Sequence, residues 1–164
     1  MDIQEVIKSR RSIRDFSTKP VPKDLIEKII DCARFAATAR NVQPWEFVVV
    51  TDKNILKQIA NIAENGRFIA DCSCCIVVLC EDTKYYLEDG CAATVSLMLA
   101  GYGLGIGSCW VAGDKKPYSQ GILEFINAPK KFKLVSLVAL GYPGSDPVLP
   151  EKRPLKELLH WEKF

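Results

Sequence analysis

Residues 10–16 read RRSIRDF, and this stretch determines how the rest of the chain is interpreted. Arg10, Arg11 and Arg14 place three guanidinium groups close to the hydroxyl of Ser12. A guanidinium is a planar fork of donors that matches phosphate oxygens two at a time and keeps its charge at physiological pH. The stretch therefore predicts a binding site for an anion of phosphate size. The alternative is a solvated basic turn, because short basic runs are common on protein surfaces.

The composition predicts one globular domain that spans residues 1–164. Apolar residues make up 48% of the chain and charged residues 26%, which is ordinary for a folded domain. The 22 basic and 20 acidic side chains nearly cancel, so the formal net charge is +2. Proteins that bind nucleic acid usually carry a broad basic face, so we expect no nucleic-acid partner and an anion that is bound locally.

Neither a membrane span nor a secretory signal is evident in the sequence. No apolar run approaches the roughly 20 residues that cross a bilayer. The N-terminus reads MDIQE, which is neither basic nor followed by an apolar block of the signal type. We therefore expect a cytoplasmic protein that has no membrane partner.

Seven cysteines lie mostly inside apolar segments, which is typical of buried thiols in a reducing compartment. Cys72 and Cys75 form one C-x-x-C spacing, which could hold a metal or act as a redox pair. There is no second pair, and the only histidine, His160, lies far along the chain. A four-ligand zinc site therefore has little support, and we expect no metal.

Hydrophobic periodicity and turn residues predict a chain of mixed helices and strands. The predicted helices span residues 2–9, 23–37, 53–65 (capped by Asp52), 87–102, 118–126 and 155–159, and the predicted strands span residues 46–50, 74–80, 108–111 and 135–140. The first helix is expected to be amphipathic, with Ile3, Val6 and Ile7 at helical spacing, and the expected core face of the second helix carries Leu25, Ile29, Cys32, Ala33 and Ala36. The proline-rich segment after residue 143 is expected to be an extended arm that could wrap a second subunit.

Two of these elements are expected to lie deep in the protein. Residues 74–80 form a continuous apolar block, which is typical of a strand buried on both faces at the centre of a sheet. Residues 87–102 are alanine- and leucine-rich and apolar nearly all round, so this helix is predicted to be buried on several sides, at a central position or at a dimer interface.

Residues 38–45, TARNVQPW, form a loop that carries chemistry. The planar amides of Asn41 and Gln43 each offer a donor and an acceptor, which suits an imide or a heteroaromatic edge, and Trp45 adds a flat apolar surface. The alternative is a turn in which Asn41 binds its own backbone.

Glycines at positions 101, 103, 105 and 107 invite comparison with the dinucleotide fingerprint G-x-G-x-x-G. The third glycine is absent in either frame, since the positions concerned hold Ile106 and Ser108. A dinucleotide loop also runs from strand to helix, whereas this stretch is predicted to run from helix to strand. A Rossmann site is therefore disfavoured.

Four separated motifs occur in the order seen in the nitroreductase family: RRSIRDF at 10–16, TARNVQPW at 38–45, LGIGSCWVAG at 104–113 and the segment 141–153. On these motifs, which span nearly the whole sequence, the chain resembles a short FMN-dependent nitroreductase-like flavoprotein. The resemblance implies a three-layer α+β fold with a mostly antiparallel central sheet and helices on both sides. It also implies an intertwined homodimer that carries two FMN molecules at the subunit interface.

The resemblance further implies a role for individual residues. By position, it implies that the phosphate is held by Arg10, Ser12, Arg14 and Arg153, with Arg11 close by. The ribityl chain or ring would be contacted by a loop of the partner subunit that carries Thr38, Asn41 and Gln43, and the pyrimidine edge by Asn65. The isoalloxazine would face the backbone of Trp110, Val111, Ala112 and Gly113. One of these backbone amides would lie near the ring nitrogen that accepts hydride. The chain departs from the family pattern at Ala37 and Thr38, where Pro-Ser is common, and at Glu151, so Lys152 would have to supply a second cation.

The activity implied by the resemblance is that of an NAD(P)H-dependent flavin oxidoreductase. NADH or NADPH would reduce FMN and leave before a nitroaromatic, quinone or related small acceptor takes its place, which is a ping-pong scheme. The chemistry lies on the flavin, so no catalytic side chain is expected, and His160 is interpreted as a surface residue. The alternative is an FMN-binding carrier or sensor of the same fold without efficient turnover.

Overall fold

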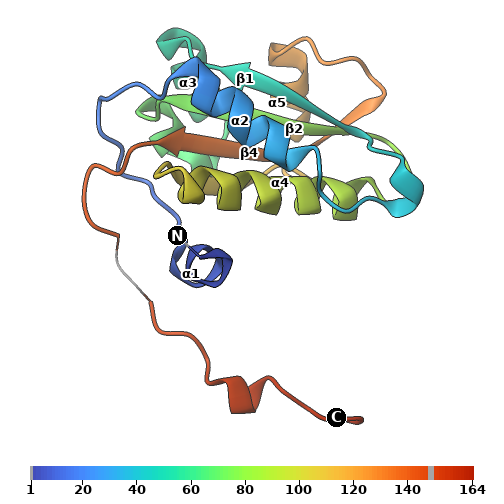
Figure 1. Ribbon diagram of the computed structural model, residues 1–164. Coiled ribbons are helices and arrows are strands. Elements are labelled where there is room, and N and C mark those ends of the chain that lie inside the picture. Colours follow the sequence, from blue (N-terminus) through green and yellow to red (C-terminus); the bar gives the residue numbers. More distant parts are fainter. Residues whose placement is uncertain (1, 148–149) are drawn as a thin grey trace.

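The computed structural model describes residues 2–147 and 150–164 (Figure 1). Its elements, in chain order, are α1 (Ile3–Ser9), α2 (Lys23–Ala33), η1 (Ala39–Asn41), β1 (Trp45–Val50), α3 (Lys53–Ile62), η2 (Glu64–Ala70), β2 (Cys74–Glu81), α4 (Tyr86–Gly103), β3 (Gly107–Ala112), α5 (Ser119–Phe125), β4 (Phe132–Gly141) and η3 (Leu155–Glu157). Here η marks a 3-10 helix.

The centre of the molecule is a four-stranded sheet in the order β1-β2-β4-β3, with every neighbouring pair antiparallel. This confirms the predicted α+β class and the mostly antiparallel sheet. Strand β2 lies between β1 and β4, and all its residues except Glu81 are buried. The prediction that residues 74–80 form a central strand is therefore confirmed.

Helices cover both faces of the sheet, as predicted, and the sheet divides the core into two clusters (Figure 1). Alternate side chains of β2 point to opposite faces because a strand has a period of two. Val77 and Leu79 pack with α3 and α5 on one face, whereas Ile76 and Val78 pack with α2 and α4 on the other. The result is three layers, helix–sheet–helix.

Side-chain caps mark the starts of α1 and α3. The carboxylate of Asp52 accepts from the backbone N–H of Asn54 at 2.9 Å and of Ile55 at 3.0 Å, which confirms the predicted N-cap of α3. Asp2 and Glu5 form a capping box at the start of α1.

Two expectations about the helices were wrong. Helix α2 ends at Ala33 rather than near residue 37, because the N–H groups of Phe35 and Ala36 bond three residues back and tighten the chain into a turn. Cys32, expected on the core face, is exposed, since only Ile29 and Ala33 at that end point toward the sheet.

Helix α1 forms where the sequence predicts it, but its apolar face is not buried. Ile3 is 63% and Ile7 57% exposed, and only Val6 is buried. The helix lies outside the three layers and contacts α4 (Figure 1). The amphipathic pattern predicted the helix correctly but not what covers it.

Helix α4 runs the length of the sheet on the face that it shares with α2 (Figure 1). It buries Ala93, Leu97 and Met98 against the sheet, while Val95 remains 46% exposed. The chain then turns through Gly105, whose φ of 77° suits a residue without a β carbon, and enters β3. The glycine stretch thus runs from helix to strand, which confirms that it is not a dinucleotide turn.

After β4 the chain leaves the body as the predicted extended arm (Figure 1). Residues 148–149 of this arm lie outside the described residues. The helix predicted at 155–159 is a short 3-10 turn, η3, and the side chains of residues 150–164 are exposed, including Leu155 at 71% and Trp161 at 74%. Within the described ranges, no helix combines the length and the apolar character that a membrane span requires.

Candidate functional site

The RRSIRDF stretch is an extended segment that is fastened to the edge of the sheet. The N–H of Ile13 donates to the carbonyl of Ser108 at 2.9 Å, and the side chains of Ile13 and Phe16 are buried in the core. Ser12 and Arg14 therefore face outward. They line a cavity of about 540 Å³, called the anion seat here, whose walls are residues 10–15, Ser145, Asp146, Pro147, Pro150 and Lys152.

Two arginines that line the anion seat, Arg10 and Arg11, carry buried donors that have no partner. Among the described residues, Arg10 Nη1, Arg11 Nε and Ser108 Oγ are buried without a hydrogen bond. Leaving a buried charged donor unsatisfied is costly, so such atoms usually have a ligand or water as partner. Arg11 is partly committed, because its Nη1 donates to the carbonyls of Lys8 at 2.6 Å and Arg10 at 2.8 Å and so caps the end of α1. Arg10 is thus the guanidinium most suited to an incoming anion.

The free edge of β3 lies next to this seat. In an antiparallel pair, successive residues point their N–H and C=O alternately toward and away from the partner strand. Because the carbonyl of Ser108 accepts from Ile13, residues Ser108, Trp110 and Ala112 point away from β4. The hydroxyl of Tyr118 donates to the outward carbonyl of Ala112, which agrees with this phase. The N–H groups of Trp110 and Ala112 are therefore the ones turned toward a ligand at this edge.

The same reasoning shows that the backbone N–H groups of Val111 and Gly113, which the resemblance also assigned to the isoalloxazine, do not point toward a ligand at this edge. Val111 faces β4 in the ladder, and the N–H of Gly113 donates to the carbonyl of Val135 at 3.0 Å. A β carbon at Gly113 would lie 2.5 Å from Leu134 Cγ. The glycine is thus explained by its close approach to β4.

A second, smaller cavity of about 180 Å³ lies along the β3 edge. It is lined by Arg14, Asn65, Phe68, Cys109, Trp110, Val111, Ala112, Lys116 and Tyr118. Arg14 belongs to both cavities, and its guanidinium carbon lies 5.8 Å from the centroid of the Phe68 ring. The structure therefore brings Arg10, Ser12, Arg14 and Asn65 together with the backbone of β3.

The 38–43 loop lies at the other end of α4. The hydroxyl of Thr38 donates to Asp89 Oδ2 at 2.8 Å, which ties the loop to the start of α4, whereas the anion seat is bonded to Ser108, just beyond the end of α4. An 18-residue helix is about 27 Å long. Thr38, Asn41 and Gln43 are consequently not brought to the arginine cluster of their own chain.

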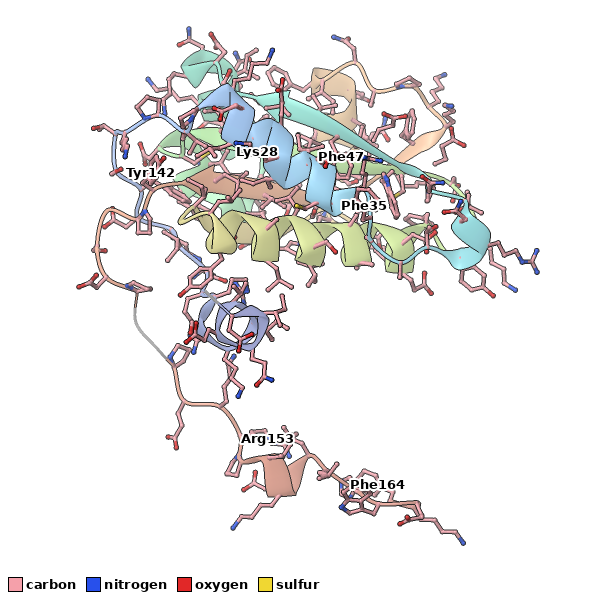
Figure 2. The ribbon with its side chains drawn as sticks, viewed as in Figure 1. Lys28, Phe35, Phe47, Tyr142, Arg153 and Phe164 are labelled. Carbon is pink, nitrogen blue, oxygen red and sulfur yellow. The ribbon has the colours of Figure 1, made fainter. Side chains whose placement is uncertain are left out.

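Arg153 is likewise separate from the seat. Figure 2 shows it on the arm, away from the body of the protein, where its guanidinium contacts Glu157. Lys152, rather than Arg153, lines the anion seat within one chain.

The cysteines of the C-x-x-C spacing are buried thiols. Cys72 Sγ donates to the carbonyls of Ile69 at 3.1 Å and Cys74 at 3.0 Å, and burial raises its pKa to about 12. Burial also raises the pKa of Cys75 well above its ordinary value. Across residues 2–147 and 150–164, no group of three or more His, Cys, Asp or Glu is placed to hold a metal ion.

This geometry can be compared with that of known proteins. A model described as "Nitroreductase family" matches residues 7–73. A protein of Methanothermobacter thermautotrophicus is 31% identical over 153 residues, which cover 90% of this chain and 80% of that protein. A protein of Archaeoglobus fulgidus is 35% identical over 150 residues, with coverage of 87% and 86%. Both are named "Putative NADH dehydrogenase/NAD(P)H nitroreductase".

The chain belongs to the nitroreductase family. Among solved structures, an FMN-dependent nitroreductase from Clostridium difficile matches with a TM-score of 0.90 at 25% identity, covering 98% of this chain and 99% of that one. The resemblance drawn from the four motifs is therefore confirmed.

In this nitroreductase-family chain, some residues at the candidate site and its loop were not found from the sequence. Phe68, Lys116 and Tyr118 line the cavity at the β3 edge, but none belongs to a motif. Phe68 follows Asn65 by three residues in η2, and that 3-10 spacing could have indicated a shared face. Asp89 was also missed, because its partners lie 50 and 51 positions earlier in the chain.

Proposed function

We propose that this protein is an FMN-dependent oxidoreductase that uses NADH or NADPH to reduce small nitroaromatic, quinone or related acceptors in a ping-pong scheme. The observation that carries the proposal is the buried, unpartnered Nη1 of Arg10, in a seat that adjoins the free backbone edge of β3. The FMN dependence of the related Clostridium difficile structure supports the same cofactor.

The residues of the two cavities fit the parts of FMN. Arg10, Ser12 and Arg14 would hold the phosphate, with Arg11 fixing the end of α1 beside them. Asn65 would meet the pyrimidine edge, since it shares the smaller cavity with Arg14. When bound, FMN supplies the chemistry of accepting a hydride and passing it to an acceptor.

The backbone of β3 contributes fixed donors. The outward N–H groups of Trp110 and Ala112 are held in place by the pairing of β3 with β4, so they are oriented before charge develops on a bound ring. The hydroxyl of Tyr118 holds the carbonyl of Ala112 and steadies the same peptide segment. Lys116 adds positive charge to the cavity beside Arg14.

The complete site is proposed to form in a homodimer of chains that each fold as one domain, 1–164. Thr38, Asn41 and Gln43 sit at the far end of α4 from the anion seat, and Arg153 lies on the projecting arm (Figure 2). A second copy related by a twofold axis would supply what each chain lacks, at two equivalent sites. Exposed apolar side chains support this arrangement, among them Ile3, Ile7, Val95, Leu155 and Trp161.

We also propose a cytoplasmic location. All seven cysteines are free thiols, five of them buried, which suits a reducing compartment.

The experiment that tests the function is direct. Protein loaded with FMN should show flavin absorption that bleaches on addition of NADH or NADPH without oxygen, and that returns when a nitroaromatic or quinone is added. A protein that takes up no FMN would contradict the proposal. Bound flavin that bleaches without sustained turnover would favour the carrier or sensor alternative.

A further inference from the structure

Asp89 is a buried carboxylate outside the two cavities of the proposed cofactor site. It lies in the first turn of α4 and is 4% exposed. Its Oδ2 accepts from the hydroxyl of Thr38 at 2.8 Å, and its Oδ1 accepts from the N–H of Ala39 at 3.1 Å. No Lys or Arg of the described residues forms an ion pair with it, so these two donors are what the structure shows to offset the burial of its charge.

The only hydrogen of the Thr38 hydroxyl is used within the chain. The hydroxyl donates this hydrogen to Asp89 and accepts from the N–H of Gln43 at 3.1 Å. A relay of two hydrogen bonds therefore runs from Asp89 through the Thr38 hydroxyl to the N–H of Gln43. The second of these bonds joins the two ends of the loop. Thr38 has no donor left for a ligand.

Three residues of the loop that this relay holds have unfavourable backbone conformations. Arg40, Asn41 and Gln43 have φ values of 54°, 56° and 52°, in the left-handed region that residues with a β carbon rarely adopt. Such conformations persist only where surrounding contacts fix them. The side chains of Asn41 and Gln43 are exposed, so their packing does not fix the loop. The N–H of Asn41 donates to the carbonyl of Thr38 at 3.3 Å and that of Val42 to the carbonyl of Ala39 at 3.1 Å, which forms the turn, and the pair of hydrogen bonds at Asp89 ties this turn to α4.

We propose that Asp89 is a positioning residue that acts through Thr38 to hold Asn41 and Gln43 in the conformation that binds FMN of a second subunit. Thr38 is thereby reassigned from a flavin contact to a link in this relay. The inference rests on the proposed function, because it needs FMN at the dimer interface.

The test compares Thr38→Val, which keeps the shape but removes the hydroxyl, with Thr38→Ser, which keeps the hydroxyl. Asp89→Asn weakens the other side of the same contact, and Arg10→Ala reports on the anion seat. The apoproteins are titrated with FMN by flavin fluorescence, and their melting temperatures and dimer content are measured without FMN. The visible circular dichroism of bound flavin gives an independent signature of the ring environment.

We expect Thr38→Val and Asp89→Asn each to raise the Kd for FMN roughly tenfold, as for the loss of a hydrogen bond to a charged group. Thr38→Ser should stay within about threefold of the parent, because the bond is retained. The double variant Thr38→Val with Asp89→Asn should be no weaker than the weaker single variant, since both changes break one relay.

Two outcomes would overturn the inference: parental affinity in Thr38→Val, or equal loss in Thr38→Ser, which would show that the methyl group matters instead. Should Asp89→Asn fail to fold, the comparison of the two Thr38 variants still decides. If the parent binds FMN and Arg10→Ala does not, while Thr38→Val binds normally, only this inference fails. If the parent binds no FMN, the proposed function and the inference both fail.

Discussion

Ser145 Oγ donates a hydrogen bond to Asp15 Oδ2 at 2.7 Å, although the two residues are 130 positions apart. The N–H of Gly144 also donates to the carbonyl of Asp15, at 3.0 Å. These bonds fasten the root of the C-terminal arm to the RRSIRDF segment. The arm therefore leaves the body beside the anion seat.

This relationship predicts that Asp15 and Ser145 act as a pair. Asp15→Ala should lower the free energy of unfolding by about 1 kcal/mol, since an exposed hydrogen bond contributes little more. Ser145→Ala should cost about the same, and the double variant no more than either single one. Urea unfolding of the four proteins checks this, and additive losses would contradict a direct coupling.

Arg10→Ala should lower FMN retention without lowering the stability of the apoprotein. The variant removes a charged donor from the phosphate, which is expected to weaken FMN binding about tenfold or more. Folding should be spared because Arg10 Nη1 has no partner in the protein. The measurements are the flavin-to-protein ratio after dialysis and the apoprotein melting temperature. Arg34→Ala, at an exposed arginine of another surface, is the matched control; equal flavin content in the two variants would contradict the prediction.

Gly113→Ala should destabilise the fold because its methyl group would meet Leu134 at 2.5 Å. Overpacking of this kind costs about 1 to 3 kcal/mol. Gly121→Ala in α5 is the control, since its methyl group would make an ordinary contact of 3.5 Å with Ile62 and alanine favours a helix. Thermal unfolding should show a lower midpoint for the first variant and an equal or higher midpoint for the second.

Tyr86 should make stability depend on pH in the alkaline range. Its hydroxyl donates to Asp114 Oδ1 at 2.6 Å, and this hydrogen bond, with burial and nearby carboxylates, raises the pKa of Tyr86 from 10.0 to about 12. The folded state then holds its proton more tightly than the unfolded state. The contribution to stability is complete below pH 10 and is lost as the pH rises toward about 12.

Tyr86→Phe isolates this contribution from the buried thiols, which titrate in a similar range. Between about pH 10 and pH 12, the range set by the two pKa values, the free energy of unfolding should fall less steeply in the variant. Parallel pH dependences in the two proteins would show that the Tyr86–Asp114 bond does not hold the proton in solution.

The thiols should divide into reactive and protected groups. Cys32 is exposed, whereas burial raises the pKa of Cys72 and of Cys74 to about 12. The thiolate is the reactive form, so a thiol reagent at neutral pH should modify Cys32 first. Cys32→Ser should remove the fast phase of the reaction, and Cys72→Ser should leave it unchanged.

The sequence was most informative where a signal is local. The apolar run at 74–80 and the N-cap at Asp52 each depend on neighbouring residues, and both were predicted correctly. The structure also shows a cavity lined by Arg10 and Arg14, which occupy one short segment, and anion binding there stays a prediction. Periodicity failed for Cys32, because it identifies an apolar face but not the element that covers it.

The remaining features depend on long-range geometry. Which amides of β3 are free follows from the strand order and from the bond between Ile13 and Ser108, neither of which can be read from the glycine-rich motif. The use of the Thr38 hydroxyl follows from Asp89, on another element. In both cases the motif indicated a segment, and only the fold showed which of its atoms remain available.

Helix α4 sets the distance between the 38–43 loop and the anion seat of the same chain. Asp89, which binds the loop, lies in its first turn, and Ser108, which is bonded to the segment of the anion seat, follows its end. One inserted residue would lengthen the helix by about 1.5 Å and rotate one end against the other by about 100°. In a twofold assembly that error would appear at both sites at once. Changes in chain length are therefore far easier to accommodate in the surface loops and the C-terminal arm than within this helix.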